Sequence, residues 1–186
     1  MRAVGIHTLT PVTALAEREE RFSAFVFSHR ERARRLAWRL IGGDEAAAED
    51  VTQDALVKAY QALTSFREDS TLATWFYRIL VRQAQTYRRW RAVRNFWHRE
   101  LGESENCIPE EKFGEPTLRR RITQALDRLS RRQREAFILV HLEGFTVQEC
   151  ADLLGKPVGT VKSHLHRALV ILRHELADFQ ELVGGE

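Results

Sequence analysis

Residues 146–168 read TVQECADLLGKPVGTVKSHLHRA and contain two helical segments separated by a glycine and a proline. Thr146 followed three residues later by Glu149 is a capping-box pattern, which predicts a short helix running through Leu154. Gly155 ends that helix, and Pro157 stands just before a second helical stretch. A short helix, a tight turn and a second helix form a helix-turn-helix, a motif whose second helix enters the major groove of DNA.

The second helix of this motif has a basic polar face opposite an apolar stripe. We expect Arg167 to bond a guanine, Ser163 to bond either kind of base, and Gly159 to let the backbone approach DNA closely. The lysines suit phosphates. A solvated helix hairpin is the alternative interpretation of the same pattern. The candidate duplex-contacting residues are Lys156, Gly159, Thr160, Lys162, Ser163, His166 and Arg167.

The rest of the chain is also predicted to be helical. Apolar residues with a 3.6-residue period predict helices from about Glu19 to Leu40 and from about Asp44 to Leu63, separated by two glycines. A loop, SFREDST, precedes a long helix that contains residues 74–99. A second capping box at Ser130 predicts a helix that runs to about Glu143.

Residues 74–99 combine positive charge with aromatic rings. They hold seven arginines, seven aromatic residues and no carboxylate. Some of these rings have to be core, because a small domain needs them. Burial of all the rings with merely solvated arginines is one interpretation. The other is a surface for partly single-stranded DNA, on which arginines contact phosphates and rings or loop residues hold unstacked bases.

Charge is distributed unevenly along the 186 residues. Residues 70–99 carry seven arginines and no acid, residues 100–116 carry six glutamates against one lysine, and residues 117–176 carry eleven Lys/Arg against six Asp/Glu. We therefore predict an all-α protein of two small helical domains joined by an acidic flexible linker. The predicted organisation is a tail at 1–18, a domain at 19–99, the linker at 100–116 and a helix-turn-helix domain at 117–178.

Several classes of protein are disfavoured. No stretch approaches the roughly 18 apolar residues that span a bilayer, and no clean secretory leader is present. Cys107 and Cys150 form no metal-binding spacing, and we expect Cys150 to be a small buried residue. No nucleophile, carboxylate pair or phosphate-cradling glycine loop indicates an enzyme. We expect a cytoplasmic protein without a metal or cofactor.

Taken together and in order, these segments resemble a bacterial extracytoplasmic function (ECF) sigma factor. AEDVTQDALVKAYQAL (48–63) resembles region 2.2 of that family, and SFREDSTLATWFYRI (65–79) resembles region 2.3. The arginine-rich remainder resembles region 2.4, and residues 129–168 resemble region 4. Each segment alone only suggests this family, whereas all the segments in this order and at this spacing are specific to it.

The resemblance implies roles that the residues alone leave open. The exposed face with Asp50, Gln53, Asp54 and Val57, otherwise a solvated face, would contact the β′ coiled coil of core RNA polymerase, and the β flap is a further expected partner. The helix from Gly159 would read the −35 promoter element as duplex. The −10 element, including its non-template single strand, would contact Phe66, Arg67, Glu68, Asp69, Ser70, Arg78, Arg82 and Arg89.

The resemblance also implies a function and a regulator. The chain would bind core RNA polymerase, recognise both promoter elements and promote transcription initiation. An anti-sigma factor, which can hold such a protein at the inner membrane, would occlude both domains. A helix-turn-helix regulator that binds duplex DNA without polymerase is the alternative function. The chain departs from the family at Glu68, where glycine is common, and at Arg82, Thr86 and His164.

Overall fold

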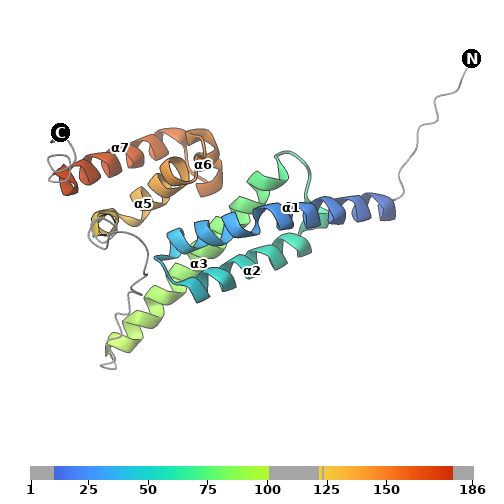
Figure 1. The fold of residues 1–186 in the computed structure, drawn as a ribbon, viewed down its shortest axis with the longest axis horizontal. Helices are drawn as coiled ribbons and strands as arrows, with labels where there is room; N and C mark the ends of the chain where they lie inside the picture. Colours follow the sequence, from blue (N-terminus) through green and yellow to red (C-terminus); the bar gives the residue numbers. More distant parts are fainter. Residues whose placement is uncertain (1–10, 101–121, 123, 178–186) are drawn as a thin grey trace, which may run out of the picture.

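The computed structural model describes residues 11–100, 122 and 124–177, and within these residues the regular elements are all helical. This confirms the predicted all-α, two-domain fold. Figure 1 shows two groups of packed helices, one from the first half of the chain and one from the second. The helices are α1 (Pro11–Ile41), α2 (Glu45–Gln61), α3 (Leu72–Glu100), α5 (Arg131–Phe137), α6 (Val147–Leu154) and α7 (Val158–Glu175).

The first two helices form an antiparallel hairpin. Gly42 and Gly43 adopt φ angles of 96° and 91°, which lets the chain reverse after α1. Asp44 then caps α2, because its carboxylate accepts a hydrogen bond of 3.0 Å from the Ala47 amide. Cross-helix pairs fix the register of the hairpin. These pairs are Glu19 with Tyr60, Arg30 with Glu49, and Arg34 with Glu45.

The buried faces of α1 and α2 pack with α3 around one apolar core. α1 begins at Pro11, earlier than the expected start near Glu19. The small residues of α2 allow close approach of the other two helices, while α3 contributes the largest buried rings. The fully buried members of this core include Leu36, Ala37, Ala48, Ala55, Phe76, Tyr77 and Leu80.

The second domain contains the predicted helix-turn-helix. Both predicted capping boxes are present: the side chains of Ser130 and Thr146 accept hydrogen bonds at the starts of α5 and α6. Gly155 ends α6 in the left-handed conformation, with φ 61° and ψ 44°. Cys150 is buried, as expected, and burial raises the pKa of its thiol to about 12. The thiol therefore stays protonated and acts as a small apolar core group.

The helix that was expected to continue to Glu143 is interrupted. α5 ends at Phe137 and a π-helical turn occupies Ile138–Leu142. The Glu143 amide donates to the Ile138 carbonyl over 3.0 Å, which closes the wider turn. Gly144, with φ 75°, then redirects the chain. Turns of this kind are rare and cluster at functional positions.

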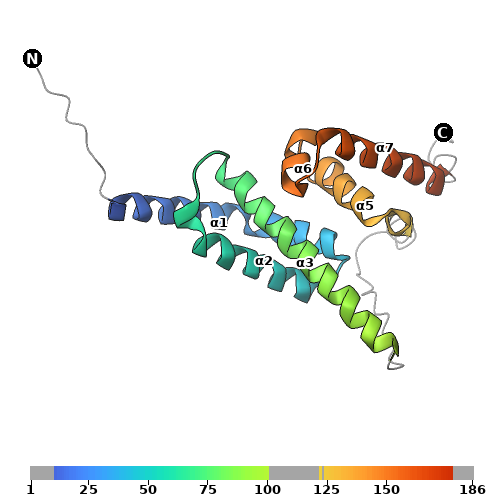
Figure 2. The ribbon, with the colours of Figure 1, turned by 180° about the vertical axis from the view of Figure 1, so that it is seen from behind.

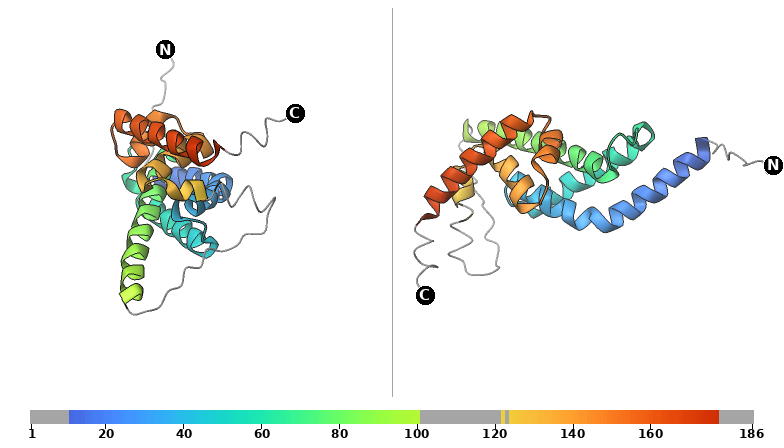
Figure 3. Two further views of the ribbon diagram at one scale, coloured as in Figure 1. Left: turned by 90° about the vertical axis from the view of Figure 1, so that its left-hand side faces the viewer. Right: turned by 90° about the horizontal axis from the view of Figure 1, so that it is seen from above.

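The two domains are packed against each other. α6 lies against α3, and the rear and side views show the second domain seated over the first, with α7 on the outer side (Figures 2 and 3). One hydrophobic cluster includes Tyr77 and Leu80 of the first domain and Leu139 and Leu153 of the second. The predicted acidic linker and most of the tail lie outside the described residues. Within those residues, no helix has the length and apolarity needed to cross a bilayer.

Candidate nucleic-acid and polymerase interfaces

The exposed face of α2 carries the four residues predicted to contact polymerase. The opposite face of the helix, with Val51, Thr52 and Ala55, is buried against α1 and α3. The helical period therefore turns two carboxylates and an amide to solvent on one side, together with a branched apolar side chain that is 48% exposed. The exposed residues are Asp50, Gln53, Asp54 and Val57.

The loop after α2 presents most of the predicted −10 residues to solvent. Arg67, Glu68 and Asp69 are exposed, and Ser70 is half-buried. Phe66 differs from the expectation, because its residue is only 4% exposed and its ring packs 5.0 Å from that of Trp75. The loop is short and its first residue lies over the apolar core, so the ring anchors the loop and offers no free face to a base.

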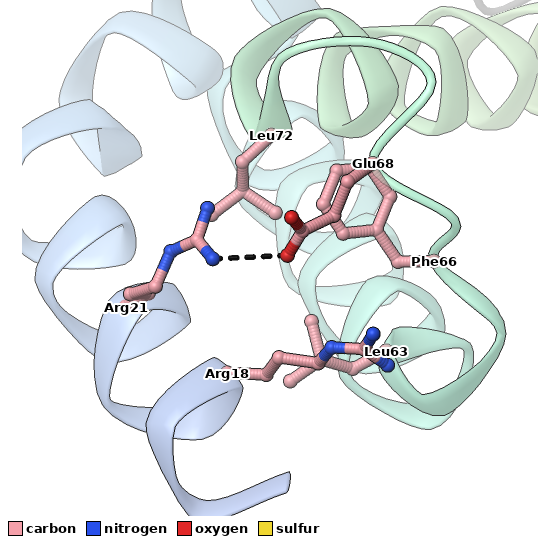
Figure 4. A pocket seen from close by; sticks show the side chains of 6 residues that line it. All are labelled: Arg18, Arg21, Leu63, Phe66, Glu68 and Leu72. Carbon is pink, nitrogen blue, oxygen red and sulfur yellow. Dashed lines mark hydrogen bonds and ion pairs between the residues drawn. The ribbon is translucent and has the colours of Figure 1, made fainter. Parts of the chain in front are cut away.

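Glu68 adopts a backbone conformation that glycine favours. Its φ of 60° is in the left-handed region, the one such value among non-glycine residues in the described part of the chain. The Arg21 guanidinium lies 2.9 Å from the Glu68 carboxylate and connects the loop to α1. Figure 4 shows this pair at the rim of a shallow hollow, floored by Leu63, Phe66 and Leu72. Glycine would adopt this left-handed backbone without a Cβ clash.

Two of the three predicted arginines of α3 are fully presented to solvent. Arg82 and Arg89 are exposed, whereas Arg78 is half-buried and its Nε is buried without a hydrogen-bond partner. Trp90 was not singled out from the sequence: it is 55% exposed, and the Arg94 guanidinium lies 4.4 Å from its ring centre. An aromatic residue followed four positions later by arginine is the signal that could have identified this stack.

The described aromatic rings of the same helix are divided between the core and the surface. From the sequence, some of them were expected to lie in the core. Phe76 and Tyr77 are fully buried, Trp75 and Tyr87 are half-buried, and Trp90 is exposed. The helix therefore contributes a buried aromatic seam to the first domain and leaves an arginine-rich outer face.

The outer face of α7 displays the residues predicted for duplex DNA. Val161, Leu165 and Ala168 on the opposite face are buried, which fixes the rotation of the helix. Thr160 is half-buried, and an added Cβ at Gly159 would meet nothing within 4 Å, so the backbone is open there. The exposed residues of this face are Gly159, Lys162, Ser163, His166 and Arg167, and Lys156 is exposed in the turn just before α7.

His164 lies beside this face and not on it. Its side chain is half-buried, and burial, followed by the nearby positive charges of Arg132, Arg167 and Lys156, lowers the pKa of its imidazole. The ring is therefore neutral at pH 7, because its pKa lies below the ordinary value of about 6.5. It adds no positive charge to the face at neutral pH.

Comparison with known families covers both domains. The family model "sigma-70 region 2" matches residues 17–94, and "sigma-70, region 4" matches residues 119–172. The chain is 31% identical to the ECF RNA polymerase sigma-E factor of Escherichia coli, over 81% of this chain and 83% of that protein.

The chain belongs to the ECF sigma factors. It is an alternative sigma factor of RNA polymerase, because the region 2 match covers residues 17–94, most of the first domain, and the region 4 match covers the helix-turn-helix. A regulator that binds duplex DNA without polymerase does not account for the region 2 match. It is also 26% identical to the ECF RNA polymerase sigma factor SigW of Bacillus subtilis, over 86% of this chain and 91% of that one.

Two solved structures share the arrangement of this ECF sigma factor. The sigma factor RpoE of Bartonella quintana, solved with the anti-sigma factor NepR, matches with a TM-score of 0.70 and 29% identity, over 85% of this chain and 98% of that chain. CnrH, solved with the cytosolic domain of CnrY, matches with a TM-score of 0.64 and 25% identity, over 90% and 95% of the two chains.

Ionic contacts between the two domains of the sigma factor were not anticipated from the sequence. Arg32 and Arg39 of α1 pair with Glu143, and Arg88 of α3 lies 3.6 Å from Glu135. We call these five residues the interdomain seam. No local sequence signal could have found it, because each partner is an ordinary charged residue far away along the chain.

The described residues offer no metal centre. Within residues 11–100, 122 and 124–177, no group of three or more His, Cys, Asp or Glu side chains is placed to hold an ion.

Proposed function

We propose that this sigma factor binds core RNA polymerase through the exposed face of α2, the face of Asp50, Gln53, Asp54 and Val57. Support comes from the separation of the two faces of the helix. One face is buried in the domain, and the other combines carboxylates, an amide and a partly exposed valine. In an interface of this composition, the apolar side chain is buried against the polymerase and the polar groups fix the orientation of the two proteins.

The −10 element is assigned to the loop 67–70 and the outer face of α3. Arg82 and Arg89 supply positive charge for a phosphate backbone, while Arg67 and Ser70 supply donors close to the start of α3. The buried ring of Phe66 packs on Trp75 and anchors the loop to the domain. The exposed Trp90 adds a flat surface on the same helix.

The −35 element is assigned to α7. Arg167 and Ser163 are the base-reading candidates, and Lys156 and Lys162 are the phosphate-contacting candidates. The Ser163 hydroxyl donates to the Gly159 carbonyl over 3.0 Å, so its oxygen lone pairs remain available to accept a hydrogen bond from a base. The single observation that carries the proposal is that Lys162, Ser163 and Arg167 share one exposed face on the second helix of a helix-turn-helix, with Lys156 exposed in the turn before it.

A selection experiment tests these assignments. Holoenzyme made with this sigma factor transcribes a library in which both promoter elements are randomised, and the transcripts are sequenced. The wild type should enrich one sequence at each element. The double variant S163A/R167A should lose enrichment at the −35 element and keep it at the −10 element. Unchanged enrichment at the −35 element in the double variant would contradict the assignment of α7.

Regulation by an anti-sigma factor in the cytoplasm, or at the inner membrane, is the accompanying proposal. Its support is that two of the structural relatives were solved with proteins that bind them, the anti-sigma factor NepR and the cytosolic domain of CnrY. Affinity capture of the tagged chain from unstressed cells should recover one such protein in near-stoichiometric amount. Capture of core polymerase alone would contradict this proposal.

A further inference from the structure

His164 lies on the flank of α7, between the buried stripe of the helix and its outer face. Its side chain is half-buried, and the ring nitrogen Nε2 is enclosed without a hydrogen-bond partner. An enclosed nitrogen without a partner is unfavourable, and in the protonated ring it has to be a donor. The free chain therefore holds a neutral histidine at the edge of the surface assigned to the −35 element.

Arg132 brings a positive charge from α5 to the same flank. α5 packs along α7, and among the neighbouring charges that of Arg132 most strongly disfavours protonation of His164. Arg131 and Arg134 of the same helix donate to carboxylates of their own domain, over 2.9 Å and 2.8 Å. Arg132 is exposed and forms no ion pair with a side chain in the described part of the chain. Its guanidinium is therefore available to an external ligand.

Three elements contribute cations around the imidazole. Besides Arg132 of α5, these cations are Lys156 in the turn before α7 and Arg167 nearly one turn further along α7. Within the described residues, no carboxylate is among the groups that shift the pKa of this ring. Like charges on one surface repel one another and create a positive potential that attracts an anion. A phosphate group bound here would relieve the repulsion.

The flank with His164 points away from Lys162. Residues two apart in an α-helix lie about 200° apart around its axis, so these two side chains are on opposite edges of the outer face, with Ser163 between them. The major groove is about 12 Å wide and admits one helix, which then has a phosphate backbone on each side. Lys162 therefore approaches one DNA strand, and the flank with His164 approaches the other.

We propose that Arg132 and His164 form a phosphate-binding site for the DNA strand opposite to the one that Lys162 contacts, and that His164 takes up a proton from solvent when the phosphate binds. This site rests on the proposed assignment of α7 to the −35 element, and it adds α5 to that interface. Arg132 supplies a permanent charge. The protonated imidazole supplies a second charge, and its outer nitrogen donates to a phosphate oxygen.

Proton uptake makes the affinity for DNA depend on pH. In the free chain, burial holds the pKa of His164 below the ordinary value of about 6.5. A phosphate beside the ring raises this pKa, because an opposite charge favours the protonated form. Between the two pKa values the complex binds more protons than the free chain, so the affinity rises as the pH falls through that range. One proton permits a gain of at most about tenfold per pH unit.

Two measurements on the holoenzyme test the site. Promoter fragments carry either the −35 sequence enriched in the selection above or a scrambled one, and the ratio of the two affinities isolates the −35 contribution. In the first measurement, single phosphates of the −35 element are replaced by neutral methylphosphonates on each strand in turn. In the second, the ratio is measured from pH 5.5 to pH 8. The controls R128A and H174Q remove an exposed arginine and an exposed histidine near the far end of α7.

We expect the wild type and R128A to lose at least threefold in affinity when a phosphate beside the site is replaced. R132A should be insensitive to that replacement, R132K should remain sensitive, and K162A should be insensitive to a replacement on the other strand. The affinity ratio should rise at least threefold from pH 8 to pH 5.5 in the wild type and in H174Q, and H164Q should lose most of this rise. Circular dichroism checks that each variant is folded.

Two results would overturn the site. One is an R132A variant that stays sensitive to every replacement that the wild type senses, and the other is an H164Q variant that keeps the whole rise at low pH. A wild-type holoenzyme without a preference for the intact −35 element would instead refute the assignment of α7 itself.

Discussion

Arg21 and Glu68 lie 2.9 Å apart and connect the first helix to the loop assigned to the −10 element. Because Glu68 has a left-handed backbone, the loop keeps a conformation that its sequence does not favour. Both side chains are about half-exposed, so the pair contributes only about 0.2–1 kcal/mol. The buried ring of Phe66 next to it is the stronger anchor of the loop.

Substitution of Glu68 separates backbone strain from the ion pair. E68A loses the pair and keeps the strained conformation, whereas E68G loses the pair and relieves the strain. We expect E68G to be more stable than E68A by about 1 kcal/mol, because glycine adopts positive φ without a Cβ clash. Urea unfolding of both variants measures this difference. Equal stability would show that the loop does not hold this conformation in solution.

Removal of the exposed arginines of α3 should change the salt dependence of DNA binding. The double variant R82A/R89A would lose the two phosphate contacts that we propose for these arginines. The slope of log affinity against log salt concentration for a fork-shaped promoter should become shallower by about 0.7 per lost contact. R173A, which removes an exposed arginine from the far end of α7, is the control and should keep the slope of the wild type. A double variant with an unchanged slope would remove these arginines from the −10 contact.

Protonation of Glu149 should contribute to acid unfolding. The backbone N–H of Thr146 donates to its carboxylate over 2.8 Å, and this bond, followed by one from the Thr146 hydroxyl, lowers the pKa of Glu149. A carboxyl group whose pKa is lower in the folded state stabilises the fold above its unfolded pKa of about 4.3. That stabilisation is lost as the pH falls through the lower folded value.

E149Q isolates this contribution, because glutamine can still close the capping box. Thermal unfolding between pH 3 and pH 6 should show a lower Tm in E149Q than in the wild type at pH 6, and a smaller loss of Tm as the pH falls, so that the two Tm values converge towards pH 3. A variant that follows the wild type across the whole range would show that the capping carboxylate has an ordinary pKa.

Local patterns in the sequence predicted the elements around the candidate site. The capping boxes at Ser130 and Thr146 and the glycine at 155 specify helix ends through contacts within a few residues. The exposed faces of α2 and α7 follow from helical periodicity, because the apolar residues choose the buried side. These features depend on the nearest neighbours along the chain, and sequence reasoning can therefore reach them.

Long-range contacts were beyond such reasoning. Glu143 looks like the polar end of an ordinary helix, and its burial depends on Arg32 and Arg39 in the other domain. The π-helical turn that positions it has no signature in residues 138–142. Phe66 was expected at the −10 element from the family resemblance alone, whereas the packing of its ring on Trp75, nine positions further along the chain, is a tertiary contact.

Binding of the labelled sigma factor to purified core RNA polymerase tests whether the exposed face of α2 is the polymerase contact. The wild type is compared with D50A/Q53A/D54A on α2 and with the control E17A/E20A, which removes two exposed acids from α1. We expect tight binding by the wild type and the control, and at least a tenfold loss of affinity in the α2 variant. An α2 variant that binds as tightly as the control would show that this face does not contact polymerase.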